Sequence, residues 1–176
     1  MRRMAILVVV ALAATLSAVP AGAACPTGWG SKKETSDKHP DAVMINARAG
    51  QHACFDRFVV VVDGDAPGYS VRYVKTFVPD ASGRAVELRG KATLAVVALG
   101  VRAHDDDGNP TYRPARRRNM VDVSGFRTFR QAYWGGTFEG TTTIGLGVRA
   151  RLPFRVFTLD GPGERSRLVV DVAHRW

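Results

Sequence analysis

The sequence predicts an all-β fold, a β-sandwich of roughly seven to nine short strands. Three observations point to this class. Helical periodicity is not sustained anywhere after the N-terminal apolar stretch. Short apolar or alternating segments are separated by clusters of Gly, Pro, Asp and Ser, which favour turns. The C-terminal region contains two apolar segments, 152–159 and 167–173, on either side of the turn-rich sequence DGPGERS at 160–166.

These two C-terminal segments predict a β-hairpin with a definite register. If the strands pair symmetrically about Gly163, one face buries four apolar side chains and the other face pairs Arg155 with Asp171. The apolar pairs are Phe154 with Val172 and Val156 with Val170. A slip of one residue would turn the apolar groups outward and separate the ion pair, so the pattern favours this register.

Residues 1–23 have the composition of a secretory signal peptide. Arg2 and Arg3 form a positive start, residues 5–19 form an apolar stretch, and Ala21-Gly22-Ala23 forms a small-x-small cleavage site. The apolar stretch is shorter than the roughly twenty residues that a membrane-spanning helix needs, and no later segment is apolar for long enough. We therefore expect an exported protein with no transmembrane segment.

Cys25 and Cys54 are the two cysteines of the chain, and both follow the predicted cleavage site. An even number of cysteines in an oxidising compartment favours a disulfide, which would stabilise the fold by roughly 3 kcal/mol in the chain-entropy model. Two alternatives are open. The thiols could be unpaired, or Cys25 could carry a lipid, although Gly22 stands where a lipoprotein site normally has an aliphatic residue.

The rest of the chain predicts one domain preceded by an irregular arm. Residues 24–41 are polar and should form an arm tethered by the disulfide, followed by the sandwich domain at 42–176. Cleavage after residue 23 removes two of the 25 Lys and Arg and none of the 16 acidic residues, which leaves a net charge of +7. Outside the cell this charge favours anionic envelope polymers or lipid head groups over nucleic acid as partners. The alternative is that the arginines merely reflect a GC-rich coding sequence.

The clearest strand within the domain is FDRFVVVVD at 55–63, whose continuous apolar run at 58–62 is typical of burial on both faces. Gly145 and Gly147 lie inside another expected strand and predict a bulge or a close backbone approach. Besides the hairpin, the other segments expected to be strands are 42–47, 69–77, 86–88, 92–101, 121–134 and 138–148.

Residues 104–119, HDDDGNPTYRPARRRN, predict a long surface loop. Asp105, Asp107 and Asn109 have the spacing of the first three ligands of a calcium loop. The Gly at the sixth position and the Glu at the twelfth position of such a loop are missing. We therefore favour a hydrated acidic turn and expect neither a metal nor a cofactor.

No catalytic motif is recognisable in the sequence. Val123-Ser124-Gly125 lacks the first Gly of a nucleophile elbow and lies within an extended pattern. The histidines show no metal-ligand spacing; they are His39, His52, His104 and His174. We expect no enzyme activity, but a Ser-His-Asp triad could still be assembled in space, so an exported hydrolase with an unrecognised site is one alternative.

Arg149, Arg151 and Arg155 are the candidate binding residues. They alternate along the chain and would project from one side if a single strand continued through Pro153. Such a row could present guanidinium groups to carboxylates or phosphates. The alternative is that these charges keep the sheet face hydrated and pair with Asp171.

Several segments together resemble a known family. They are CPTGWGS at 25–31, CFDRFVVVVDG at 54–64, PGYSVRYV at 67–74, GTFEGTTTIGLGVRARLPFRVFTLDGPGE at 136–164 and RLVVDVAH at 167–174. This combination resembles the AMIN-like domain of secreted proteins from high-GC Gram-positive bacteria. That family is similar to the AMIN domain of envelope proteins such as N-acetylmuramoyl-L-alanine amidases, in which two β-sheets form a sandwich that targets the enzyme to peptidoglycan. The resemblance implies an all-β, non-catalytic, envelope-associated module, and it transfers no catalytic or binding residue.

The combined hypothesis is a secreted, extracellular or cell-wall-associated module that binds an anionic envelope component such as peptidoglycan or another anionic glycan. The export signal, the positive charge and the family resemblance motivate it. Two alternatives from other classes stay open: the exported hydrolase, and an extracellular protein-interaction module that uses a sheet edge.

Overall fold

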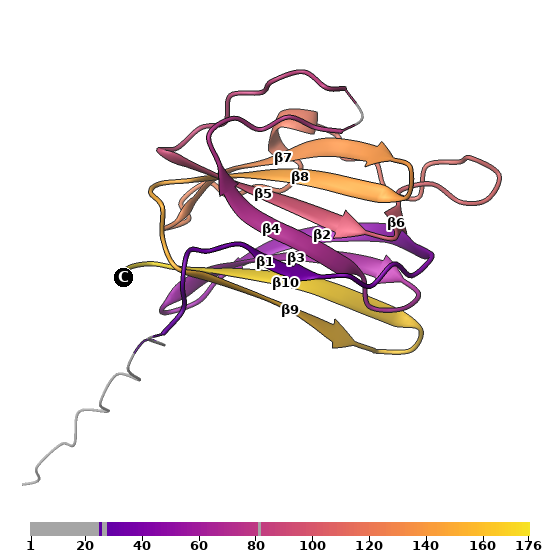
Figure 1. Cartoon of the computed structure of the whole chain (residues 1–176), viewed down its shortest axis with the longest axis horizontal. Coiled ribbons are helices and arrows are strands. Elements are labelled where there is room, and N and C mark those ends of the chain that lie inside the picture. The colour runs from indigo at the N-terminus through magenta and orange to yellow at the C-terminus, as the bar shows by residue number, and fades with distance from the viewer. Residues whose placement is uncertain (1–24, 26–27, 81) are drawn as a thin grey trace, which may run out of the picture.

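The computed structural model describes Cys25, residues 28–80 and residues 82–176, so the predicted signal peptide at 1–23 lies outside the described residues. Two five-stranded sheets pack face to face (Figure 1), which confirms the predicted all-β sandwich. The described residues form ten strands rather than seven to nine. Two of the strands, β1 and β6, are only three and two residues long.

The first sheet is antiparallel throughout, and the second is antiparallel except at the β2–β6 edge. The first sheet has the strand order β1-β4-β5-β8-β7, with β1 (Glu34–Ser36), β4 (Gly68–Val74), β5 (Ala92–Leu99), β8 (Thr141–Val148) and β7 (Phe129–Phe138). The second has the order β6-β2-β3-β10-β9, with β6 (Val101–Arg102), β2 (Ala42–Gln51), β3 (Phe55–Asp63), β10 (Arg165–Ala173) and β9 (Phe154–Asp160). A single turn of 3-10 helix, Arg117–Asn119, lies in the long connection before β7.

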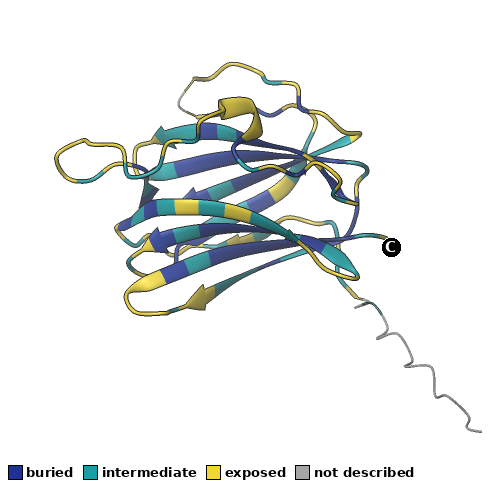
Figure 2. Ribbon diagram, turned by 180° about the vertical axis from the view of Figure 1, so that it is seen from behind, coloured by how far each residue is buried: buried dark blue, intermediate teal, exposed yellow. Residues whose placement is uncertain are grey.

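The hydrophobic core fills the space between the two sheets. Phe58, Val60 and Val62 of β3 have no exposed surface, and they belong to one buried cluster with Leu94 and Val96 of β5. Figure 2 shows that buried residues run along the strands of both sheets, whereas exposed residues gather in the loops. Because side chains alternate along a strand, the residues between the core positions point to the outer face of their sheet.

The C-terminal hairpin has the register that the sequence predicts. In the β9–β10 ladder Phe154 lies opposite Val172 and Val156 opposite Val170. All four side chains are buried, with at most 7 % of their surface exposed. Arg155 lies opposite Asp171 on the other face. The predicted register of the hairpin is therefore confirmed for each of these residue pairs, and its apolar face forms part of the core.

Gly100 divides a segment that the sequence predicts as one strand, 92–101. The part before Gly100 is β5 in the first sheet, and the part after it is β6 in the second sheet. Gly100 has a φ of 66°, and a Cβ at this position would overlap the carbonyl oxygen of Pro40. Only glycine combines this backbone conformation with so close an approach. The chain can therefore cross between the sheets here, and β6 pairs with β2 in parallel.

The strand expected at 86–88 does not form; a single bridge between Phe77 and Val86 takes its place. The segment instead lies across the outside of β8. A Cβ on Gly147 would overlap the carbonyl oxygen of Arg89, and one on Gly145 would come within 2.7 Å of Leu88 Cδ1. The predicted close backbone approach is thus confirmed at Gly147, whereas at Gly145 it is side chains that come close. The irregular pairing lies in the neighbouring strand β7.

Two expected boundaries differ from the structure. β7 begins at Phe129 rather than at 121, because residues 121–128 form turns, one of them closed by the Asp122 carboxylate, which accepts a hydrogen bond from the Ser124 amide at 2.9 Å. β2 is expected at 42–47 but extends to Gln51. Its pairing with β3 shifts register between Met44 and Asn46. The predicted loop at 104–119 is confirmed, with η1 at its end, and it extends away from one end of the sandwich (Figure 1).

The N-terminal arm is more regular than the sequence suggests, because it connects the edges of both sheets. Its residues Glu34–Ser36 pair with β4 of the first sheet. On the other side, the Phe154 amide donates to the Gly30 carbonyl at 2.8 Å, and the Val156 amide donates to Glu34 Oε2 at 3.0 Å. The arm therefore closes the side of the sandwich between β4 and β9 (Figure 1).

Candidate functional site

Arginines and aromatic residues gather on the outer face of the second sheet. The registers of β2, β3, β10 and β9 place five arginines on this face, which we call the arginine face. Its outward residues are Val43, Asn46, Arg48, Gly50, Phe55, Arg57, Val59, Val61, Asp63, Arg155, Phe157, Leu159, Arg165, Arg167, Val169, Asp171 and Ala173. Three of them form one row across neighbouring strands: Arg57, Asp171 and Arg155.

The Asp171 carboxylate lies between the two arginines of this row. Arg57 donates to it twice, from Nε to Oδ1 at 2.7 Å and from a terminal nitrogen to Oδ2 at 2.9 Å. Arg155 donates from Nε to Oδ2 at 2.9 Å. The Asp171 side chain is fully buried, whereas those of Arg57 and Arg155 are 26 % and 41 % exposed. The acid is thus hidden beneath two guanidinium groups that still reach solvent.

The pKa of Arg57 is raised above its ordinary value, mainly because Asp171 accepts its hydrogen bonds and also because the carboxylate attracts its charge. Burial acts in the opposite direction and is outweighed. The contact with Asp171 therefore favours the charged form of Arg57.

Aromatic rings contact the guanidinium groups of both Arg57 and Arg155. The Arg155 group lies 4.4 Å from the centre of the Trp29 ring and 5.1 Å from that of Phe157. The Arg57 group lies 5.2 Å from the centre of the Phe55 ring and 5.4 Å from that of Phe157. These are cation–π distances. Because charge pairing and ring contacts fix the two side chains, their binding to a partner would cost little rotamer entropy.

The structure does not bring the three arginines predicted from the sequence onto one strand. β8 ends at Val148 and β9 begins at Phe154, so the expected continuous strand is interrupted. Arg149 donates to the His174 carbonyl, and Arg151 donates to the Ser31 carbonyl at 2.8 Å. Among the three, Arg155 lies on the arginine face, and the binding roles stay predictions.

Sequence reasoning did not predict that Arg48, Arg57, Arg165 and Arg167 lie on the arginine face. Arg57 could have been found by extending the hairpin pattern one strand further, because Asp171 lies opposite Arg57 in the β3–β10 ladder as well as opposite Arg155. Arg48 has no such signal, since its position on this face depends on the register shift in β2.

A second basic region lies beside Arg151. A groove of about 940 Å³ between β5 and the 75–91 segment is lined by Lys75, Lys91 and Arg151, with Glu87 as its acidic member. The Tyr73 phenol forms part of its wall. Its oxygen donates to the Leu152 carbonyl at 2.9 Å, and burial raises the pKa of this phenol.

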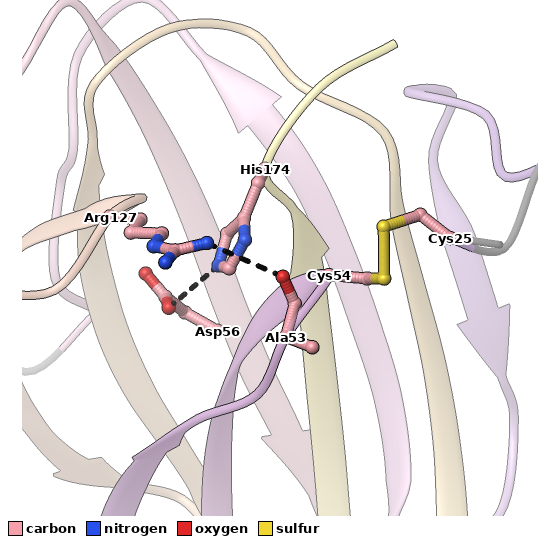
Figure 3. Close-up of a disulfide and its surroundings, with 6 residues drawn as sticks. All are labelled: Cys25, Ala53, Cys54, Asp56, Arg127 and His174. Atoms are coloured by element: carbon pink, nitrogen blue, oxygen red, sulfur yellow. Dashed lines mark hydrogen bonds and ion pairs between the residues drawn. A yellow bond between two sulfur atoms is a disulfide. The ribbon is translucent and has the colours of Figure 1, made fainter. Parts of the chain in front are cut away.

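His174 and Asp56 form a hydrogen-bonded pair beside the disulfide (Figure 3), with 3.0 Å between His174 Nε2 and Asp56 Oδ1. The other carboxylate oxygen of Asp56 accepts hydrogen bonds from the backbone amides of Thr128, at 2.5 Å, and Phe129, at 3.2 Å. Asp56 is fully buried. Within the described residues, no serine hydroxyl is hydrogen-bonded to His174. The pair therefore ties β3 to the start of β7 and the end of β10.

The acidic turn of the 104–119 loop is closed by its own side chains. The Asp105 carboxylate accepts hydrogen bonds from the Asn109 amide at 2.7 Å and from Asn109 Nδ2 at 3.2 Å, and these bonds lower the pKa of Asp105. Asp106 pairs with Arg102 at 2.7 Å. Among the described residues, no group of three or more His, Cys, Asp or Glu is arranged to hold a metal ion.

Cys25 and Cys54 form a disulfide (Figure 3), as predicted. The bond joins the arm to the start of β3, close to the His174 pair. A disulfide-bonded Cys25 cannot carry a thioether-linked lipid, and neither cysteine is a free thiol. No helix among the described residues has the length and apolar character needed to cross a bilayer.

Comparisons with known proteins add one match. The family model described as "AMIN-like domain" matches residues 42–174, which include every strand except β1. No curated protein and no solved structure matches the chain.

Proposed function

Because the chain belongs to the AMIN-like domain family, we propose that it is a secreted, non-catalytic module that attaches to an anionic polymer of the cell envelope, with peptidoglycan as the first candidate. The family supports a peptidoglycan-related binding role. The disulfide between Cys25 and Cys54 supports an oxidising location outside the cytoplasm, in keeping with the predicted signal peptide at 1–23.

One observation carries the proposal: the outer face of the second sheet presents five arginines against two carboxylates, and one of these carboxylates, Asp171, is buried. Arg48, Arg57, Arg155, Arg165 and Arg167 face outward with Asp63 and Asp171, so the local net charge is +3. An extended sheet surface can contact a linear polymer along its length. Guanidinium groups bind carboxylates and phosphates, and the neighbouring aromatic rings can pack against sugar rings.

The three arginines predicted from the sequence have different parts in this proposal. Arg155 belongs to the arginine face. Arg151 lines the separate basic groove with Lys75 and Lys91, and we assign it a secondary contact with the same polymer. The Arg149 side chain donates to the His174 carbonyl and its backbone amide donates to the Thr128 carbonyl at 2.9 Å, so we assign it a structural role.

Sedimentation with insoluble peptidoglycan sacculi tests the proposal. The mature, disulfide-bonded protein should be retained at low salt and released progressively as the NaCl concentration rises, because salt screens contacts between exposed charges. Absence of retention at low salt would rule out the proposed function.

A pair of charge-matched variants tests the assignment of the face. Arg48→Gln combined with Arg165→Gln removes two charges from the outer side of the second sheet. Arg72→Gln combined with Arg84→Gln removes two exposed arginines elsewhere. The first variant should be released at lower salt than wild type and the second should not. Equal behaviour of the two would show that net charge, rather than this face, determines retention.

The hydrolase alternative has its best candidate in the pair of His174 and Asp56. In the described residues this pair has no hydrogen-bonded nucleophile, and both Asp56 oxygens serve buried structural contacts. Incubation of sacculi with the protein, followed by measurement of soluble fragments, should give no release above buffer. Release that disappears in His174→Ala would favour the hydrolase. Retention by a proteinaceous but not by a purified glycan fraction would favour the protein-interaction alternative.

A further inference from the structure

A small hollow lies in the middle of the arginine face. Its volume is about 150 Å³, and Arg48, Arg57 and Arg167 form its rim. Val59 and Val169 form its floor and are 6 % and 1 % exposed. The floor is therefore apolar and rigid because it belongs to two paired central strands, and the rim carries three positive charges.

No acidic residue is among the described residues that line the hollow. The nearest carboxylate on this face is Asp171, which Arg57 and Arg155 already engage from both sides. Two rim arginines have unused hydrogen-bond capacity. A terminal nitrogen of Arg167 donates to the Asp160 carbonyl at 3.3 Å, but its Nε is buried without a partner. The Arg48 side chain is exposed and makes no hydrogen bond within the described part of the chain. The hollow thus offers donors and positive charge without an acceptor.

The size of the hollow limits the occupant. A volume of about 150 Å³ corresponds to roughly five water molecules, whereas sites for drug-sized ligands occupy roughly 300–1,000 Å³. A carboxylate with one short alkyl branch suits this volume, because the carboxylate can reach the arginine rim while the alkyl group covers the valine floor. A phosphate would leave that floor without an apolar contact.

Building on the function proposed above, we infer that the hollow binds a free carboxylate that carries a methyl-sized branch, such as the terminal alanine of a peptide stem. Arg48 and Arg167 supply the principal charge contacts. Arg57, held in place by Asp171, adds a third donor. The polymer would thus be anchored by its peptide ends, while the remainder of the arginine face contacts its length.

Titration of the isotopically labelled protein, followed by amide NMR shifts, tests this site with defined probes. N-acetyl-D-alanine should cause saturable shifts at Gly50, Val59 and Val169. N-acetyl-D-alaninamide, which lacks the carboxylate, should cause none. N-acetylglycine should bind about fourfold more weakly, because one buried methyl group is missing. Inorganic phosphate should bind more weakly than N-acetyl-D-alanine.

Two variants and a control complete the test. Arg48→Gln and Arg167→Gln should each weaken N-acetyl-D-alanine binding at least tenfold, whereas Arg72→Gln on β4 should leave it unchanged. Arg48 is exposed, so its variant is expected to fold normally even if Arg167→Gln is destabilised. Equal binding of the amide probe, phosphate binding as tight as that of the carboxylate, or an unchanged affinity in Arg48→Gln would each overturn the inference.

The two proposals fail in different ways. Retention on sacculi without saturable shifts from N-acetyl-D-alanine would discard the hollow and leave the function standing. Saturable binding of N-acetyl-D-alanine without retention on sacculi would support the hollow and discard peptidoglycan as the target.

Discussion

Asp171 lies opposite Arg155 in the β9–β10 ladder, and the fully buried carboxylate accepts a hydrogen bond from this arginine at 2.9 Å. On its other side the same carboxylate accepts two hydrogen bonds from Arg57. One acid thus orients two arginines on the proposed binding face. A buried ion pair adds little net stability compared with an apolar replacement, but removing one partner leaves the others uncompensated.

Asp171→Asn should therefore lower the free energy of unfolding by about 3 kcal/mol, as measured by guanidinium denaturation. This is the lower end of the range for breaking a buried pair, because Arg57 and Arg155 keep partial access to water. Asp106→Asn provides the control. Asp106 also pairs with an arginine, but its side chain is 92 % exposed, and its loss should cost at most about 1 kcal/mol. Similar effects of the two substitutions would contradict the structural importance assigned to Asp171.

Gly147→Ala should destabilise the protein by roughly 1–3 kcal/mol. The added methyl group would overlap the Arg89 carbonyl oxygen, which is backbone and cannot rotate away. Gly50→Ala is the matched control within a strand, because its Cβ would meet no atom within 4 Å. Thermal unfolding of both variants checks the prediction. A Gly147→Ala protein as stable as Gly50→Ala would show that the segment at Arg89 does not rest on β8.

Replacing both Cys25 and Cys54 by Ser should lower the free energy of unfolding by about 3–4 kcal/mol, because the bond closes a loop with a sequence separation of 29. Intact-mass measurement of the secreted wild-type protein before and after reduction should show a gain of two hydrogens. Detection of free thiols before reduction would contradict the bond. Reducing agent should destabilise the wild type and leave the double variant unaffected.

The pH dependence of stability should report on Glu34. Burial raises its pKa above the ordinary value of 4.5, and the hydrogen bond from the Val156 amide only partly opposes this. The folded protein therefore keeps this proton to a higher pH than the unfolded chain does. Stability contributed by Glu34 is thus present below 4.5 and is lost as the pH rises through the folded-state pKa.

Glu34→Gln removes this titration while keeping an oxygen for the Val156 amide. From pH 4.5 upward, the free energy of unfolding of the variant should fall less with pH than that of wild type. Urea denaturation at a series of pH values measures both curves. Parallel curves would show that Glu34 does not reach the buried edge of β9.

The sequence predicted correctly those parts of the fold that depend on the pattern of residues close together in the chain. The hairpin register follows from the alternation of Phe154, Val156 and their partners, because a one-residue slip would expose the whole apolar face. β3 has the boundaries that its apolar run predicts, Phe55–Asp63. The two wrong predictions, a strand at 86–88 and an unbroken strand through Gly100, have one cause. A short apolar segment can join a sheet, lie across it or pass to the other sheet. Which of these occurs depends on contacts with backbone segments that are distant in the sequence.

The sequence by itself determined the all-β class and the C-terminal hairpin with its pair of Arg155 and Asp171, because local alternation is sufficient for these. It favoured a bond between Cys25 and Cys54, and the structure decided between that bond and the alternatives. Only the tertiary structure decided which arginines share a surface. Arg57 and Arg167 lie on adjacent paired strands more than 100 residues apart in the chain, and Arg149 and Arg151 are drawn away from Arg155 by contacts with His174 and Ser31. A binding face on a sheet is made by strand pairing across the sequence, and the register of that pairing is set by the packing of the whole core.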